Sequence, residues 1–248
     1  SAFENLMASY GYAIQIYCDF SGYSDMAIGL ALLMGFTLPP NFNTPYKSAS
    51  ITEFWRRWHI SLSSWLRDYL YISLGGNRKG KFRTYFNLFM TMFLGGLWHG
   101  ANWKFVFWGV LHGLALAFER FFGQFIKLPK NYVVRFFQIL LTFHFVVFCW
   151  LFFRAKDFET VFIMVENISQ LRWNWEQFQT ILLGYKNVFM LLAFGFIWHF
   201  LPTKFTNFNE KLFEKLPLLI KAVILGFIFW IVYATAAEGT QPFIYFQF

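Results

Sequence analysis

Long apolar segments alternate with short polar connections along this chain. Four of them have or approach the length that crosses a bilayer, about 17–25 residues: Trp103–Phe118, Val133–Phe153, Val188–Leu201 with its neighbours, and Leu218–Ala234. Charged or proline-containing loops separate them. The pattern predicts an all-α, polytopic transmembrane protein.

Two further apolar segments are interrupted. Leu6–Phe36 is long but contains Asp19 and Asp25, and Tyr85–Leu97 is short and ends in the pair Gly95-Gly96. Broken helices are tolerated at membrane depth only where they line a cavity or pack inside protein. We therefore expect short, broken helices around a channel or a buried site.

The two aspartates allow two interpretations. The first is a pair of buried, hydrogen-bonded carboxylates that fix helix packing through Ser21, Ser24 or Arg56. The second is a role in orienting a catalytic histidine.

A segment rich in tryptophan and arginine, Ser50–Tyr71, has a different pattern. Ser50 and Glu53 fit a capping box, which predicts that a helix begins at Ser50. Aromatic and leucine residues then recur every three or four positions, with His59 on the apolar side. The pattern predicts an interfacial amphipathic helix, and such anchoring is compatible with a catalytic role.

Composition supports the membrane assignment. Hydrophobic residues make up 57% of the 248 residues and charged residues only 14%, against about 25% charged in soluble domains. The formal net charge of +8 indicates cytoplasmic loops and headgroup contacts. No block of like charges resembles a nucleic-acid-binding arm, so we expect no nucleic-acid partner. Cys18 and Cys149 lie in apolar surroundings, which favours buried thiols.

The loop after the amphipathic segment is basic, with Arg78, Lys79, Lys81 and Arg83 close together. The positive-inside rule predicts that this loop is cytoplasmic. Binding of a phosphate-rich donor by this loop is the alternative interpretation, and we favour the topological one.

One histidine stands out, His99 in the stretch "FLGGLWHGANW". An ionisable group in apolar surroundings is costly, so a functional role is the working hypothesis. For His112, His144 and His199 we favour packing in the core or at interfaces, because an imidazole has an apolar body and a polar tip.

Several long motifs resemble the membrane-bound O-acyltransferase (MBOAT) family. They are "DFSGYSDMAIG" (19–29), "NFNTPY" (41–46), "EFWRRWHISLSSWLRDYLY" (53–71), "LGGNR" (74–78), "LGGLWHGANW" (94–103) and "PFIYFQF" (242–248). They are most similar to the bacterial branch that exports acetyl groups to alginate or peptidoglycan, with the D-alanyl exporter of teichoic acid as a close cousin. The resemblance implies that residues 1–248 are the C-terminal part of a single transmembrane domain whose N-terminal helices are absent from this chain.

The resemblance also implies a site. The family's invariant histidine matches His99, and its second polar position, histidine in this branch, matches His59. The family brings both to the centre of a transmembrane tunnel. We expect Trp98, Asn102, Trp103, Trp55, Arg56 and Arg78 to contact substrate, with Trp98 and Trp103 excluding water. Gly95, Gly96 and Gly100 would let backbone approach the reacting atoms.

The implied reaction moves acetyl from a cytoplasmic donor, expected to be acetyl-CoA, across the membrane to a cell-envelope polysaccharide. A neutral imidazole takes the proton of the attacking hydroxyl, so His99 is the expected general base and His59 its helper. An acyl-histidine intermediate is the mechanistic alternative. We expect no metal and no bound cofactor.

The resemblance implies a multi-pass protein of the bacterial cytoplasmic membrane whose partners are the bilayer and a secreted or membrane-anchored acetyltransferase. Two alternative functions remain open. One is a non-catalytic acyl-group transporter or scaffold for a separate transferase, and the other is D-alanyl transfer to teichoic acid.

Overall fold

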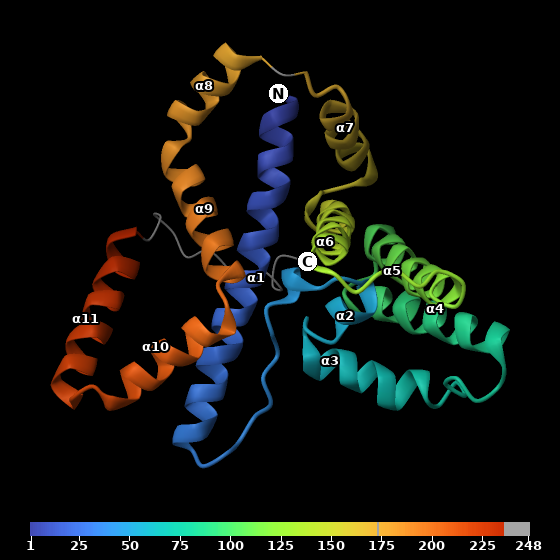
Figure 1. The fold of residues 1–248 in the computed structure, drawn as a ribbon, viewed down its shortest axis with the longest axis horizontal. Helices are drawn as coiled ribbons and strands as arrows, with labels where there is room; N and C mark the ends of the chain where they lie inside the picture. Colours follow the sequence, from blue (N-terminus) through green and yellow to red (C-terminus); the bar gives the residue numbers. More distant parts are fainter. Residues whose placement is uncertain (173, 236–248) are drawn as a thin grey trace.

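The computed structural model describes residues 1–172 and 174–235, and this part of the chain is built of helices and loops (Figure 1). The helices are α1 (Ala2–Leu33), η1 (Pro45–Lys47), α2 (Ile51–Trp55), α3 (Ile60–Trp65), η2 (Leu66–Tyr71), α4 (Lys81–Trp98), α5 (Trp103–Phe122), α6 (Tyr132–Arg154), α7 (Phe158–Ser169), α8 (Trp175–Gly184), α9 (Lys186–Phe200), α10 (Thr203–Lys215) and α11 (Leu218–Thr235). The all-α prediction is confirmed for the described residues. The C-terminal motif "PFIYFQF" lies outside them.

Within the described residues, two helices, α5 and α6, are each long and apolar enough to cross a membrane. They confirm the predictions for 103–118 and 133–153, although α5 continues to Phe122. The third predicted span, 188–201 with its neighbours, is not one straight helix: α9 has 15 residues, and only together with α8, which it joins at a bend of 86°, is it long and apolar enough for a broken span or a re-entrant loop. The fourth, at 218–234, is an apolar helix of shorter length.

Helices α1 and α4 are continuous, so the prediction that their segments are broken was wrong. α1 runs through Asp19 and Asp25 for 32 residues, and α4 runs through Gly95-Gly96 to Trp98. Both aspartates are exposed, which also contradicts the hypothesis of buried carboxylates. A helix satisfies its own backbone hydrogen bonds, so an outward-facing carboxylate does not interrupt it.

The core lies where α1, α2, α5 and α6 meet the loop around η1. Its largest buried side chains include Trp58, Trp108, Trp150 and Tyr46. The hydroxyl of Tyr46 donates to the carbonyl of Ala13 at 2.6 Å. Its backbone N–H donates to Nε2 of His199 at 3.1 Å, which confirms the packing role predicted for that histidine.

The other packing predictions have mixed outcomes. His112 is fully buried, as expected. His144 is exposed but lies at a helix interface, with Nε2 2.7 Å from the Tyr10 hydroxyl. The Cys149 thiol is buried as predicted, whereas Cys18 is exposed on α1.

Glycines bring α4 and α5 into very close contact. A Cβ atom on Gly96 would lie 2.3 Å from the carbonyl oxygen of Phe105, and one on Gly109 would lie 2.3 Å from that of Met92. Gly96 therefore serves helix packing rather than the predicted approach of backbone to reacting atoms. Gly95 likewise faces protein, since its Cβ would meet Leu66 Cδ1 at 3.4 Å.

We expect Gly96→Ala to destabilise the protein by about 1–3 kcal/mol, because the clashing atom is backbone and α5 has to move away. Thermal unfolding of the detergent-solubilised protein, followed by tryptophan fluorescence, measures this change. Gly22→Ala in α1 is the matched control, since a Cβ there meets nothing within 4 Å. An unchanged unfolding temperature for Gly96→Ala would show that the two helices are not in close contact.

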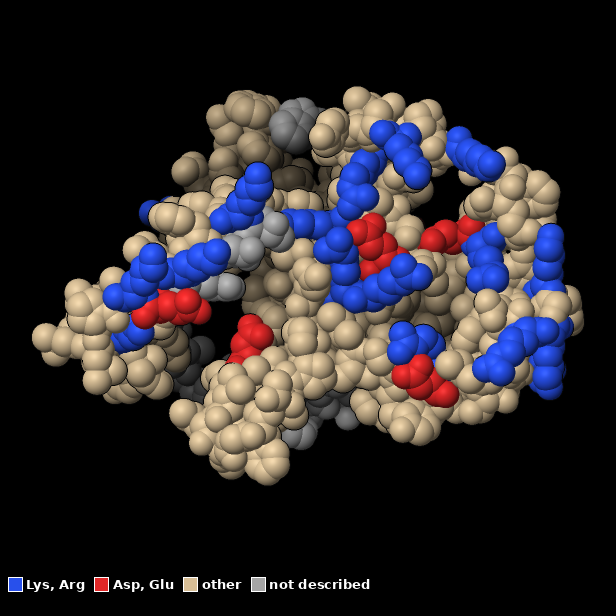
Figure 2. All heavy atoms as spheres, turned by 60° about the horizontal axis from the view of Figure 1, so that its bottom comes forward, with Lys and Arg blue, Asp and Glu red and all other residues tan. Residues whose placement is uncertain are grey.

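Basic side chains dominate one face of the molecule. Figure 2 shows Lys and Arg spread over this face in greater number than Asp and Glu. Such a distribution is typical of the cytoplasmic ends of membrane proteins.

Candidate active site

His99 lies in the tight turn that joins α4 to α5. Its N–H donates to the carbonyl of Gly96 at 3.1 Å, which ends α4. Gly100 follows with φ +152°, a conformation that side chains disfavour. The side chain of Asn102 then caps α5 by accepting from the N–H of Lys104 at 3.1 Å. Hydrogen bonds therefore fix both the end of α4 and the start of α5, and His99 lies between them.

Aromatic rings from three helices surround the half-buried imidazole. The ring centroid of His99 is 5.0 Å from that of Trp98 on α4. It lies 5.2 Å from Trp108 on α5, with the planes at 89°, and 5.0 Å from Phe153 on α6, with the planes at 80°. We call His99 and these three rings the aromatic box. An imidazolium ion is poorly solvated in such surroundings.

The second histidine, His59, occupies a break in the tryptophan-rich segment. α2 ends at Trp55, and His59 adopts the left-handed conformation with φ 42° and ψ 57° immediately before α3. The prediction of one helix over Ser50–Tyr71 was therefore wrong, although its start is correct. Ser50 Oγ accepts from the N–H of Glu53 at 3.1 Å.

A remote asparagine stabilises this break. The carbonyl of Asn41 accepts from the N–H of Ile60 at 2.9 Å. Its side-chain oxygen accepts from the N–H of Ser61 at 3.1 Å and from the Ser61 hydroxyl at 2.6 Å. Asn41 thus supplies the cap that His59 does not provide to α3.

The structure brings His59 and His99 into one electrostatic environment. Burial, and to a lesser extent the charge of His59, lower the pKa of His99 to about 3. Burial also lowers the pKa of His59 to about 4; its ring packs edge-on against Phe20 at 4.7 Å. Both histidines lie outside the candidate spans, and both are neutral at pH 7.

The predicted substrate-contacting residues differ in exposure and in contacts. Trp98 contacts His99 but is 58% exposed, and Trp103 is 77% exposed. Trp103 therefore does not shield the imidazole from water, whereas Trp108 and Phe153 are buried beside it. The side chain of Asn102 is used as a helix cap. The remaining arginines, Arg56 and Arg78, are exposed.

Trp55 forms a hydrogen bond with His112, a residue for which we predicted only a packing role. Its indole N–H donates to Nδ1 of His112 at 3.3 Å. His112 also packs on Trp108 at 4.8 Å, the same ring that contacts His99. Trp108 and His112 are four residues apart on one helix, so the sequence alone could have predicted that these two rings are in contact.

Comparison with known proteins relates this chain to one family of membrane proteins. The sequence profile of the membrane-bound O-acyltransferase family, MBOAT, matches residues 5–159, which include both histidines. A protein of Pseudomonas putida named probable alginate O-acetylase AlgI is 42% identical over 98% of this chain and 53% of its own length. The chain thus spans about half the length of the curated relatives it matches.

Two other relatives carry different names. The peptidoglycan O-acetyltransferase of Helicobacter pylori is 46% identical over 66% of this chain and 31% of its own length. The teichoic acid D-alanyltransferase of Bacillus subtilis is 37% identical over 62% of this chain and 42% of its own length.

Proposed function

The chain belongs to the membrane-bound O-acyltransferase family, and on this premise we propose that it carries the reaction centre of a membrane O-acetyltransferase. The observation that supports the proposal best is the pair His99 and His59, both neutral and both packed against aromatic rings. A neutral imidazole held at a defined helix junction is suited to general-base catalysis.

The proposed reaction transfers acetyl from a thioester to a hydroxyl group. His99 accepts the hydroxyl proton as the oxygen attacks the acetyl carbonyl carbon. The carbon–sulfur bond then breaks, and the proton passes from the imidazolium to the departing thiolate. His59 assists by positioning the acceptor or His99 itself, and the buried rings of Trp108 and Phe153 keep water from competing. General-base help of this kind contributes about 10²–10⁴ in rate.

The donor, acceptor and route are further parts of the proposal. Acetyl-CoA supplies acetyl from the cytoplasmic side, and acetyl passes through a tunnel of the complete protein in the bacterial cytoplasmic membrane. The acceptor is a cell-envelope polysaccharide of the alginate or peptidoglycan kind, in keeping with the names of the relatives. The higher identity to these acetylases than to the D-alanyltransferase favours acetyl as the transferred group.

We further propose that an extracytoplasmic acetyltransferase completes delivery. Full-length protein in proteoliposomes, given acetyl-CoA labelled in the acetyl group, is expected to transfer little label to added polysaccharide until that partner is supplied. Efficient transfer without the partner would contradict its involvement. Transfer from a D-alanyl donor and none from acetyl-CoA would contradict the acetyltransferase assignment.

The activity should persist in mild acid. Because the pKa values of His59 and His99 lie at about 4 and about 3, the base stays neutral well below the usual histidine pKa of about 6.5. We expect the acid limb of kcat/KM at or below about pH 4. A half-maximal kcat/KM near pH 6.5 would show that neither buried imidazole is the base.

A stability control accompanies this pH profile. The unfolded chain binds more protons than the folded one between the unfolded pKa of about 6.5 and the lowered folded values. The neutral histidines therefore do not oppose folding above pH 6.5, and stability falls as the pH drops below it. Thermal unfolding measured at each pH separates this loss of stability from the loss of activity that protonation of the base causes.

A further inference from the structure

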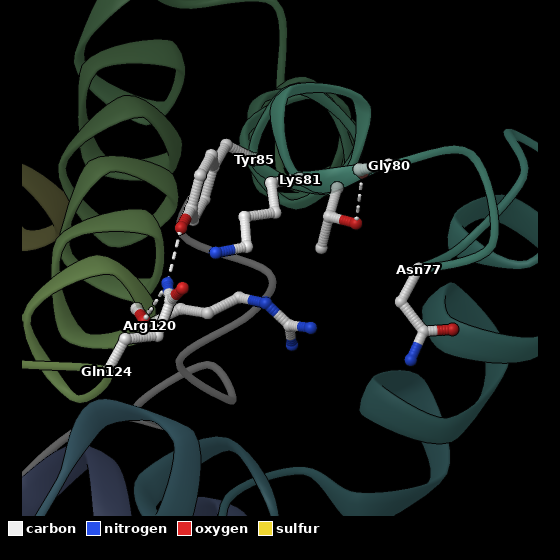
Figure 3. Close-up of a pocket in the computed structure, with 7 residues that line it drawn as sticks. Asn77, Gly80, Lys81, Tyr85, Arg120 and Gln124 are labelled. Carbon is white, nitrogen blue, oxygen red and sulfur yellow. Dashed lines mark hydrogen bonds between the residues drawn. The ribbon is translucent and has the colours of Figure 1, made fainter.

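A cationic pocket lies away from the histidine pair, where the end of α5 meets the start of α4. It has a volume of about 380 Å³ and is lined by Asn77, Gly80, Lys81, Thr84, Tyr85, Arg120 and Gln124. Figure 3 shows Lys81 and Arg120 directed from the two helices into the same space. The lining residues include no carboxylate.

The two cations lack counter-ions in the described part of the chain. Among residues 1–172 and 174–235, neither Lys81 nor Arg120 forms a salt bridge. The neighbouring carboxylate of Glu119 is already engaged, since it accepts from the N–H groups of Ile51 at 2.8 Å and Thr52 at 3.2 Å. Two like charges that face one cavity are stabilised by an anion between them.

Hydrogen-bond donors complete the pocket. The side-chain amide of Gln124 donates to the hydroxyl of Tyr85 at 2.7 Å and to the carbonyl of Arg120 at 3.1 Å. Because the Tyr85 oxygen accepts there, its own hydrogen is left to donate to a ligand. The guanidinium of Arg120 adds a planar fork that matches phosphate oxygens. The charges and hydrogen-bond donors of the lining therefore match a phosphate group.

A large apolar groove adjoins this pocket. It has a volume of about 1580 Å³, runs between α5 and α6, and shares Tyr85 with the cationic pocket. The rings of Phe118, Phe121 and Phe122 lie along it, and the centroid of Phe121 is 6.4 Å from that of Tyr85. The cationic pocket lies at the C-terminal end of the candidate span α5, and the groove extends from there along α5, the connecting loop and α6.

We propose that the cationic pocket binds the phosphate of an anionic phospholipid whose acyl chains lie along the groove. A phosphate site continuous with a long aromatic and aliphatic surface matches a molecule that has a charged head and apolar tails. The location at a basic helix end matches the anionic surface of a cytoplasmic leaflet. The site is separate from the proposed reaction centre, and its test requires no acetyl transfer.

Lipid retention by the full-length protein tests the proposal. The purified protein is incubated in detergent with dioleoyl phosphatidylglycerol or dioleoyl phosphatidylcholine, and bound lipid is measured by native mass spectrometry. In the double variant Lys81→Gln/Arg120→Gln we expect retention of phosphatidylglycerol to fall by about tenfold, because charge-assisted hydrogen bonds to phosphate are lost. Lys81→Arg/Arg120→Lys keeps both charges and should retain the lipid.

The matched control is Lys79→Gln/Arg83→Gln, which removes the same charge nearby. Lys79 lies against the turn at Gly75, and the Arg83 guanidinium lies over the ring of Phe86 at 5.2 Å; neither lines the pocket. An equal loss in this control would overturn the proposal in favour of a diffuse basic surface. Wild-type retention by Lys81→Gln/Arg120→Gln would also overturn it.

A second arm separates a lipid phosphate from a donor phosphate. Binding of acetyl-CoA is measured on the same variants by isothermal titration. If Lys81→Gln/Arg120→Gln loses acetyl-CoA and keeps phosphatidylglycerol, the pocket belongs to the donor and the lipid assignment fails. Loss of phosphatidylglycerol with acetyl-CoA binding unchanged supports the proposal.

Discussion

Replacing His99 by glutamine is expected to abolish acetyl transfer while the protein still inserts and folds. Glutamine keeps a polar tip and much of the side-chain volume, but its amide does not accept a proton near neutral pH. Loss of a general base costs about 10²–10⁴ in rate, the largest effect we expect from a single substitution in the described residues. His99→Ala should be equally inactive and somewhat less stable, because it leaves a space between Trp108 and Phe153.

The measurement uses the full-length protein with labelled acetyl-CoA, and the initial rate of transfer is compared at equal protein level. His144→Gln is the matched control, since that histidine is exposed on α6 and bonded to Tyr10, away from the aromatic box. It should transfer acetyl at the wild-type rate. Unchanged transfer by His99→Gln would contradict the catalytic assignment and favour a passive conduit with chemistry performed by a partner.

Replacing His59 should lower transfer by about tenfold or more without abolishing it, since a helper contributes less than the base it assists. The choice of substitution matters because His59 has φ 42°. Asparagine tolerates this left-handed conformation, whereas alanine there costs about 1–2 kcal/mol. We therefore expect His59→Asn to keep the wild-type unfolding temperature and His59→Ala to lower it.

Comparison of the two His59 variants separates chemistry from backbone strain. Equal loss of kcat in both, with a lower unfolding temperature only in His59→Ala, assigns the loss to the imidazole. A normal rate in His59→Asn would show that only the backbone at this position matters. If either His59 variant is more damaged than His99→Gln, the roles of base and helper are reversed.

Local sequence determined the helical class, the two spans α5 and α6, and the helix start at Ser50. Each follows from short-range properties, namely a long apolar run or a serine that caps the helix three residues before a glutamate. The sequence also singled out His99, because an imidazole within an apolar run is costly. Its motifs pointed to His59, and the family they resemble is confirmed by the profile match.

Tertiary structure decided what lies around these residues. The break at His59 depends on Asn41, which caps α3 from a separate loop. The aromatic box requires Phe153 from the far end of α6, and Gly96 matters because α5 crosses it at backbone distance. The cationic pocket likewise pairs Lys81 with Arg120 from another helix. Hydrophobic periodicity reports which face of one helix is apolar, but it carries no information on which distant segment packs there.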